Sequence, residues 1–185
     1  MHARTFVPIL AAAFAATLAT AGQAHAAPTD ADAPVLAARV VTYDASASAE
    51  FRAAVDRGAA IWNQSVDSVE LRPAAAGQRA NIRVLADNGW PRALTTSLGN
   101  GTVYIGRQAV NQGYDTVRIS AHELGHILGL PDRKPGPCTS LMSGSSAGVS
   151  CTNPYPDTAE KAEVEDNFGL ALAPPAGVTA GMVVD

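Results

Sequence analysis

The stretch HELGHILGLPD, residues 122–132, decides how this sequence is interpreted. Residues four apart lie on the same face of an α-helix, so His122 and His126 would direct two imidazoles at one point. A tetrahedral zinc ion accepts that arrangement, and the carboxylate of Glu123 can reach a water on the metal rather than the metal itself. The alternative is a helix with two solvated histidines on its surface. The pattern favours a zinc-dependent hydrolase in which Glu123 is the general base.

The N-terminus has the features of an export signal. A short, weakly positive start is followed by an apolar run at residues 6–21 and by Ala-His-Ala at 24–26, which fits the small-x-small pattern of cleavage sites. We expect residues 1–26 to be a signal peptide and the mature protein to be secreted and extracellular, without membrane association after cleavage. The alternative is an uncleaved N-terminal anchor, although no stop-transfer charges follow the run.

Cysteine content and charge indicate the environment of the mature chain. An exported protein meets an oxidising compartment, so we expect Cys138 and Cys151 to form a disulfide, with two free thiols as the alternative. Charge is mildly acidic, with 13 basic against 17 acidic residues, and no basic cluster is present. This distribution argues against a nucleic-acid partner.

The third zinc ligand is expected to be a carboxylate. The chain has four histidines, and two of them would leave with the signal peptide. Catalytic zinc sites use three protein ligands and a water, and the cysteines are expected to be paired. Asp132 is the best candidate, because Gly129 permits a left-handed turn that brings it back beneath the metal after His126. One alternative is that Asp132 only stabilises a turn. The other is a ligand from the last helix, namely Glu160, Glu163 or Glu165, although these glutamates also resemble an ordinary solvated helix face.

Apolar periodicity divides the rest of the chain into strands and helices. Apolar residues at steps of three or four mark the buried face of a helix over residues 49–65. We expect strands at 39–43, 69–71, 81–86 and 102–105, the zinc helix at 115–128 and a last helix at 157–170. In terms of domains, we expect a short propeptide or arm at 27–38, a catalytic domain at 39–170 and a flexible C-terminal tail at 171–185.

The zinc motif continues into a longer resemblance. His122-Glu123-x-x-His126-x-x-Gly129-x-x-Asp132, followed by Leu141-Met142-Ser143, resembles the metzincin pattern with aspartate as third ligand. It is similar in particular to the snapalysin family of small secreted neutral zinc proteases. The similarity runs from about Val40 to Phe168 and includes Ile61-Trp62-Asn63, Tyr114-Asp115, Gly136-Pro137-Cys138 and Ser150-Cys151-Thr152-Asn153-Pro154-Tyr155-Pro156.

This resemblance implies a fold and several further sites. The fold would be α+β and metzincin-like, with a twisted mixed β-sheet, a zinc-binding active-site helix and a C-terminal helix. Met142 would form a turn beneath the metal, and the enzyme would prefer an aromatic residue just after the scissile bond. A calcium ion would bind at Asp115 and the backbone carbonyl of Val117. The substrate-binding edge strand would contain Thr102, Val103, Tyr104 and Ile105.

One position departs from the resemblance. An aromatic residue that helps to stabilise the tetrahedral intermediate is expected two places after Asp132, but this chain has Lys134 there. Lys134 is interpreted as a solvated loop charge, with a hydrogen-bond donor to the intermediate as the alternative. The function we expect is a secreted, monomeric zinc endopeptidase that acts on proteins or peptides. The alternatives are a catalytically impaired secreted zinc-binding module and a zinc hydrolase with a non-protein substrate.

Overall fold

The computed structural model describes the chain from residue 37 to residue 172, with side chains described up to residue 169. The expected signal peptide at 1–26 lies outside the described residues, as do most of the expected arm at 27–38 and most of the expected tail at 171–185. Within the described part of the chain, no helix is long and apolar enough to cross a membrane.

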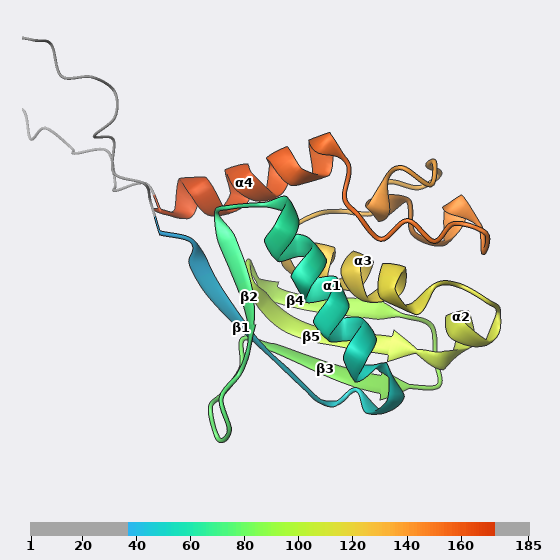
Figure 1. Ribbon diagram of the computed structural model, residues 1–185, viewed down its shortest axis with the longest axis horizontal. Helices are drawn as coiled ribbons and strands as arrows, with labels where there is room; N and C mark the ends of the chain where they lie inside the picture. Colours follow the sequence, from blue (N-terminus) through green and yellow to red (C-terminus); the bar gives the residue numbers. More distant parts are fainter. Residues whose placement is uncertain (1–36, 173–185) are drawn as a thin grey trace, which may run out of the picture. The chain divides into compact units, whose positions relative to one another are not determined.

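A five-stranded mixed β-sheet forms one layer of the domain (Figure 1). The strands are β1 (Arg39–Ala47), β2 (Val69–Pro73), β3 (Ile82–Asp87), β4 (Arg92–Ser97) and β5 (Asn100–Gly106). They lie in the order β2-β1-β3-β5-β4, and only the β4–β5 pair is antiparallel. The predicted α+β class with a mixed sheet is therefore confirmed.

The strand predicted at the edge of the sheet lies inside it. β5 contains Thr102, Val103, Tyr104 and Ile105, and it pairs with β3 on one side and with β4 on the other. Its backbone groups are used within the sheet, so they cannot bind an extended peptide along an open edge. The expectation that this strand is the substrate-binding edge is wrong, because β4 occupies that edge.

β4 has little signal in the sequence. Its residues are mostly exposed, including Leu94, and they do not alternate between apolar and polar. The strand forms by folding back onto β5 across a tight turn, where Gly99 has φ 77°, a value that favours glycine. Pairing with a neighbour, rather than burial of its own side chains, therefore defines this strand.

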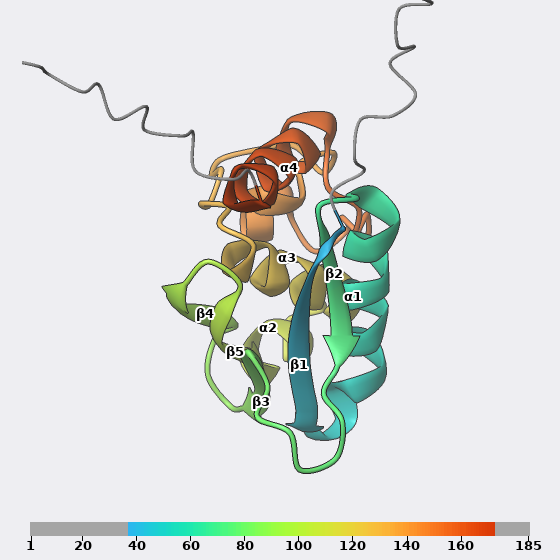
Figure 2. The same ribbon diagram turned by 90° about the vertical axis from the view of Figure 1, so that its left-hand side faces the viewer.

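Two helices, α1 (Arg52–Ser65) and α3 (Thr116–Ile127), pack against the sheet and against each other (Figures 1 and 2). The indole N–H of the buried Trp62 in α1 donates to the carbonyl of Ala121 in α3 at 2.8 Å. Gly58 approaches α3 so closely that a Cβ there would lie 2.9 Å from the backbone nitrogen of Ala121. These contacts fix α3 at the point where the candidate metal ligands begin.

The remaining elements surround α3. The short helix α2 (Arg107–Asn111) lies between β5 and α3 in the chain, and α4 (Thr158–Leu172) is the C-terminal helix. A 3-10 segment, Leu141–Ala147, packs against α3 and contains the buried Met142. Cys138 and Cys151 form the predicted disulfide, with a Cα–Cα distance of 5.5 Å. The zinc helix expected at 115–128 and the last helix expected at 157–170 are both present, as α3 and α4, with bounds within two residues of the prediction.

Candidate active site

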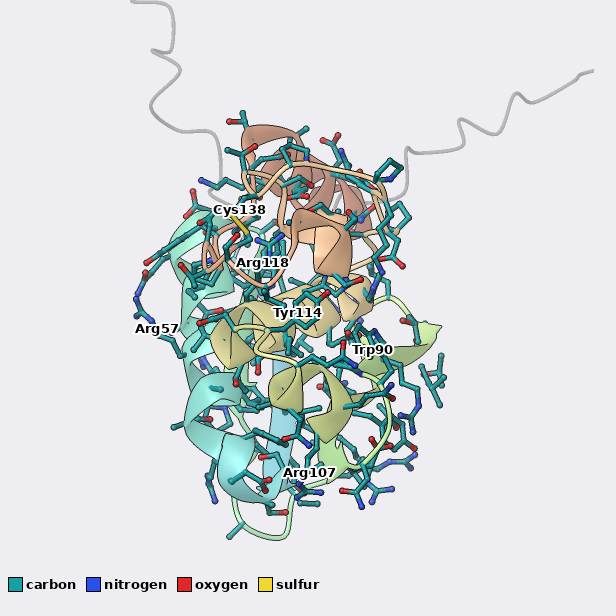
Figure 3. All side chains as sticks on the ribbon, turned by 90° about the vertical axis from the view of Figure 1, so that its right-hand side faces the viewer. Arg57, Trp90, Arg107, Tyr114, Arg118 and Cys138 are labelled. Carbon is teal, nitrogen blue, oxygen red and sulfur yellow. A yellow bond between two sulfur atoms is a disulfide. The ribbon has the colours of Figure 1, made fainter. Side chains whose placement is uncertain are left out.

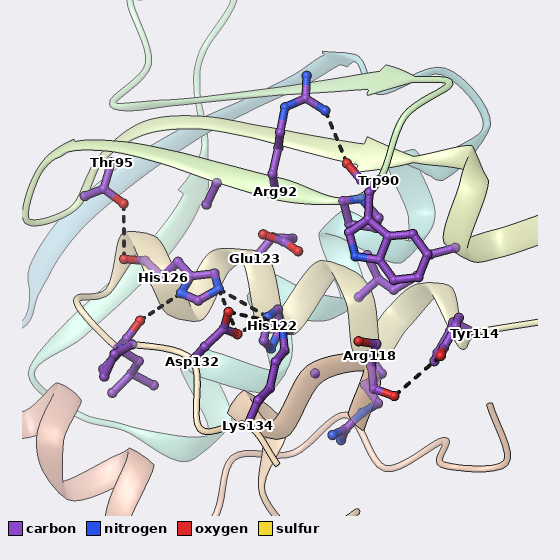
Figure 4. Close-up of a pocket in the computed structure, with 18 of the residues that line it drawn as sticks. Trp90, Arg92, Thr95, Tyr114, Arg118, His122, Glu123, His126, Asp132 and Lys134 are labelled. Atoms are coloured by element: carbon purple, nitrogen blue, oxygen red, sulfur yellow. Dashed lines mark hydrogen bonds and ion pairs between the residues drawn. The ribbon is translucent and has the colours of Figure 1, made fainter. Parts of the chain in front are cut away.

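Two histidine side chains of α3 converge on one point (Figure 4). The Nδ1 atom of His122 lies 3.1 Å from the carbonyl oxygen of Leu141, and that of His126 lies 2.8 Å from the carbonyl oxygen of Leu130. A carbonyl only accepts hydrogen bonds, so each Nδ1 carries the proton. The lone pairs of both Nε2 atoms are left free, and these atoms lie 3.2 Å apart.

Asp132 completes a set of three possible metal ligands. After α3, Gly129 adopts φ 97° and the chain turns back. Asp132 Oδ1 then lies 3.3 Å from His122 Nε2 and 3.6 Å from His126 Nε2. The three side chains are the one group of metal-ligating type found in the described part of the chain. Two imidazole nitrogens and one carboxylate oxygen fit a catalytic zinc ion.

The rival carboxylates of the last helix make other contacts. Glu163 pairs with Arg133, and Glu165 accepts from the backbone N–H groups of Asp67 and Ser68. Glu160 is completely buried and accepts hydrogen bonds from the segment that contains Met142. The sequence suggested that Glu160 lies on a solvated face, but the structure buries it. None of the three glutamates lies beside the histidines.

Glu123 is buried at the base of the cleft with one carboxylate oxygen unpaired. Its Oε2 atom is enclosed and has no hydrogen-bond partner among the described residues. Burial, and secondarily the charge of Asp132, raises the pKa of Glu123 to about 8. Burial, and secondarily the neighbouring His126, lowers the pKa of His122 to about 4, so its imidazole is neutral at pH 7. A neutral imidazole beside a buried acidic group whose pKa is raised is typical of an active site.

Met142 packs beneath the same helix. It is fully buried, and a Cβ on Gly125 would lie 2.9 Å from its sulfur. Gly125 sits between the two histidines in sequence, and its missing side chain lets the methionine approach α3 at that point. The sequence indicated a role for Met142 but gave none to Gly125.

Arg118 was not anticipated from the sequence. It lies in α3 one turn before His122, is 5% exposed, and points from the helix towards the disulfide segment (Figure 3). Its guanidinium donates to the carbonyls of Ser140 at 2.8 Å and of Asn153, and to the hydroxyl of Ser143 at 2.9 Å. A buried arginine bound to main-chain carbonyls cannot be recognised in a single sequence, because its partners are far away along the chain.

The converging ligands line a cleft of about 690 Å³. One wall contains Trp90 and Tyr114, whose rings meet edge to face with centroids 5.8 Å apart. Residues of β4 line another part, including Ala93 and Thr95. The cleft therefore joins an aromatic surface, a sheet edge and the candidate metal ligands (Figure 4).

Lys134 also faces this cleft. Its Nζ atom lies 3.1 Å from Asp132 Oδ2, the oxygen that does not face the histidines. Gly144, with φ 53°, makes room for it, because a Cβ there would lie 2.6 Å from Lys134 Cε. Lys134 is exposed, as expected for a solvated loop charge, and its ammonium group is also paired with a candidate metal ligand.

The predicted calcium residues have another local role. Asp115 is the N-cap of α3 and accepts from the backbone N–H of Arg118 at 2.7 Å, as helix-capping aspartates do. Val117 lies in the first turn of the same helix. In the described part of the chain, no further cluster of acidic, histidine or cysteine ligands includes Asp115. The calcium site stays a prediction.

Comparison with known proteins places the chain in a family. The sequence model of the "Streptomyces extracellular neutral proteinase (M7) family" matches residues 38–170. The extracellular small neutral protease of Streptomyces caespitosus is 44% identical over 126 residues, which cover 67% of this chain and 92% of that protein. Proteins of the same description from Streptomyces sp. (strain C5) and Streptomyces lividans are 41% and 42% identical, over 74% and 69% of this chain.

The length of the match differs among these relatives. The chain spans 59% of the strain C5 protein and 56% of the Streptomyces lividans protein. A crystal structure of archaemetzincin from Methanopyrus kandleri aligns over 75% of this chain and 99% of that one. Its TM-score of 0.48 and its identity of 13% are too low for any conclusion about this chain. The family match covers most of the chain and contains every candidate ligand. The chain belongs to the Streptomyces extracellular neutral proteinase (M7) family.

Proposed function

We propose that this chain is a secreted zinc endopeptidase. The observation that carries the proposal is the convergence of His122 Nε2, His126 Nε2 and Asp132 Oδ1 beside the unpaired, buried carboxylate of Glu123. The family match supports peptide-bond hydrolysis as the reaction. Relatives described as extracellular support export, and with it the signal peptide expected at residues 1–26.

The side chains at the candidate site have separate roles in the proposed reaction. His122, His126 and Asp132 would hold a zinc ion, which would lower the pKa of a bound water and polarise the scissile carbonyl. The carbonyls of Leu141 and Leu130 hold both imidazoles with Nε2 towards that position. In its ionised form, Glu123 takes the proton of the attacking water at its free Oε2 and passes it to the leaving amine.

An extended substrate would bind along β4. This strand pairs with β5 on one side, and its other edge borders the cleft that contains the ligands. A peptide can add to such an edge through backbone hydrogen bonds. Trp90 and Tyr114 offer an apolar surface for a side chain beside the scissile bond, which supports the expected preference for an aromatic residue. Calcium at Asp115 has no support from a ligand cluster and is not needed for these steps.

The rival function is a zinc-binding module with little turnover. The observation that favours it is Lys134, which stands where the resemblance predicts an aromatic residue that aids the intermediate. Glu123 argues against the binding module. Burying a carboxylate oxygen without a hydrogen-bond partner costs free energy of folding, and a role in the reaction accounts for that cost.

Casein hydrolysis with and without a chelator tests the proposed function. The secreted protein should cleave casein, lose that activity in the chelator and recover it with added zinc. Stoichiometric zinc without any cleavage would favour the binding module. Cleavage that survives complete removal of the metal would contradict the proposal.

A further inference from the structure

Glu160 is a fully buried carboxylate that the proposed mechanism does not use. It lies in the first turn of α4, and its two oxygens accept four hydrogen bonds. Oε2 accepts from the backbone N–H groups of Leu141 at 3.0 Å and Asp157 at 2.8 Å. Oε1 accepts from the Ser140 hydroxyl at 2.6 Å and from the Met142 N–H at 2.8 Å. All four neighbours are donors, which suits an ionised carboxylate because that group only accepts.

One of these bonds connects Glu160 to the candidate metal site. The Met142 N–H that donates to Glu160 belongs to the same peptide group as the Leu141 carbonyl. That carbonyl is the group that holds His122 Nδ1 at 3.1 Å. A charged acceptor on the N–H end of a peptide group makes its carbonyl oxygen a stronger acceptor, since hydrogen bonds in series polarise one another.

We propose that Glu160 is a positioning residue for the metal ligand His122 and acts on it through the Leu141–Met142 peptide group. A stronger acceptor at Nδ1 fixes the tautomer and the ring orientation and makes Nε2 a better donor to a metal. In many metal sites a carboxylate binds the ligating histidine directly. Here one peptide group lies between the carboxylate and the imidazole. The inference rests on the proposed zinc site.

Arg118 binds the same segment through backbone carbonyl groups, whereas Glu160 binds its N–H groups. It donates to the Ser140 carbonyl at 2.8 Å, whereas Glu160 accepts from the N–H of that peptide group, which is the N–H of Leu141. Arg118 Nη2 lies 3.4 Å from the Leu141 carbonyl, so its bond there is weak and leaves that oxygen to His122. Arg118 therefore anchors the segment, while the polarising contact on the peptide group bound to His122 comes from Glu160.

Glu160→Gln breaks this connection selectively. An amide has one acceptor oxygen, which serves best at the Oε2 position, where two backbone N–H groups donate. Its NH₂ group then replaces Oε1. The Ser140 hydroxyl can rotate and accept from it, but the Met142 N–H faces another donor. The helix cap at Asp157 is kept, because glutamine also serves at that position of a capping box.

The measurement is zinc affinity, obtained by competition with a chromogenic chelator at a temperature well below unfolding. We expect Glu160→Gln to weaken zinc binding at least about tenfold, the range found when the outer partner of a metal ligand is removed. The matched control is Val164→Ala, which removes buried packing from α4 one turn further on without removing a hydrogen bond to the segment. This control should lower the melting temperature and leave zinc affinity within about twofold of the wild type.

Other outcomes would overturn the inference. Unchanged zinc affinity in Glu160→Gln would do so, and so would an equal loss in Val164→Ala, which would assign the effect to general loosening of α4. If Glu160→Gln does not fold, Glu160→Asp keeps the charge but withdraws it by one methylene group, and its zinc affinity should fall. Unchanged affinity in a folded Glu160→Asp protein would contradict the proposal. A wild type that binds zinc no better than His122→Ala would instead show that the zinc site itself is wrong.

Discussion

The two sides of the candidate zinc site are built differently. On the inner side, the His122 side chain is 8% exposed and is held by a main-chain carbonyl, and Glu160 and Arg118 fix the segment that carries it. On the outer side, the Asp132 side chain is 47% exposed and contacts Lys134, whose side chain is 38% exposed. The inner ligand is positioned by buried contacts, whereas the outer ligand is exposed to solvent. Substitutions on the inner side should therefore strongly reduce activity or stability. Substitution of Lys134, the partner of the outer ligand, should reduce activity only slightly.

Glu123→Ala is expected to have the largest effect on turnover. In the proposed mechanism the residue supplies the base and no ligand, so the variant should keep its fold and its zinc. Loss of general base catalysis should reduce kcat at least about a hundredfold. Casein assays together with zinc content check this, and near-normal hydrolysis by the variant would exclude Glu123 as the base.

Removal of the disulfide should loosen the inner side. Cys138 and Cys151 are 13 residues apart in sequence and enclose the segment that holds Met142. Replacing both with serine should lower the free energy of unfolding by about 3 kcal/mol, the loop-entropy contribution for this length. Urea unfolding of the two proteins measures the difference. The prediction fails if mass mapping of the secreted protein without reductant finds two free thiols.

Lys134→Ala should have the smallest effect, because it changes the outer side. A partly exposed ion pair contributes about 0–1 kcal/mol, so kcat/KM should fall by less than about fivefold. Lys134→Arg should lie closer to the wild type, since it keeps the charge. Steady-state kinetics separates kcat from KM. A fall of about a hundredfold in kcat alone would instead make Lys134 a donor to the developing oxyanion.

The sequence could predict the features that depend on local patterns, but not those that depend on contacts between distant residues. His122, Glu123 and His126 follow from helical spacing, and Asp132 follows from the turn at Gly129, so local patterns were sufficient. β4 was missed because its pairing with β5, and not its own residue pattern, makes it a strand.

Glu160 was taken for a surface residue for a comparable reason. Its burial depends on contact with Ser140, Leu141 and Met142, which lie about 20 residues away in the chain. The pairing of Lys134 with Asp132 likewise depends on space left by Gly144. Such contacts are set by tertiary packing, which one sequence without its fold does not reveal.

Zinc content of purified Asp132→Ala tests the central claim most directly. If Asp132 completes the site with the two histidines, the variant should retain well below one zinc per chain after dialysis, as measured by atomic absorption. Glu123→Ala and Glu163→Ala, treated in the same way, should each retain one zinc, and Asp132→His should recover part of it because imidazole suits the same position. An Asp132→Ala protein that keeps a full equivalent of zinc would contradict the assignment.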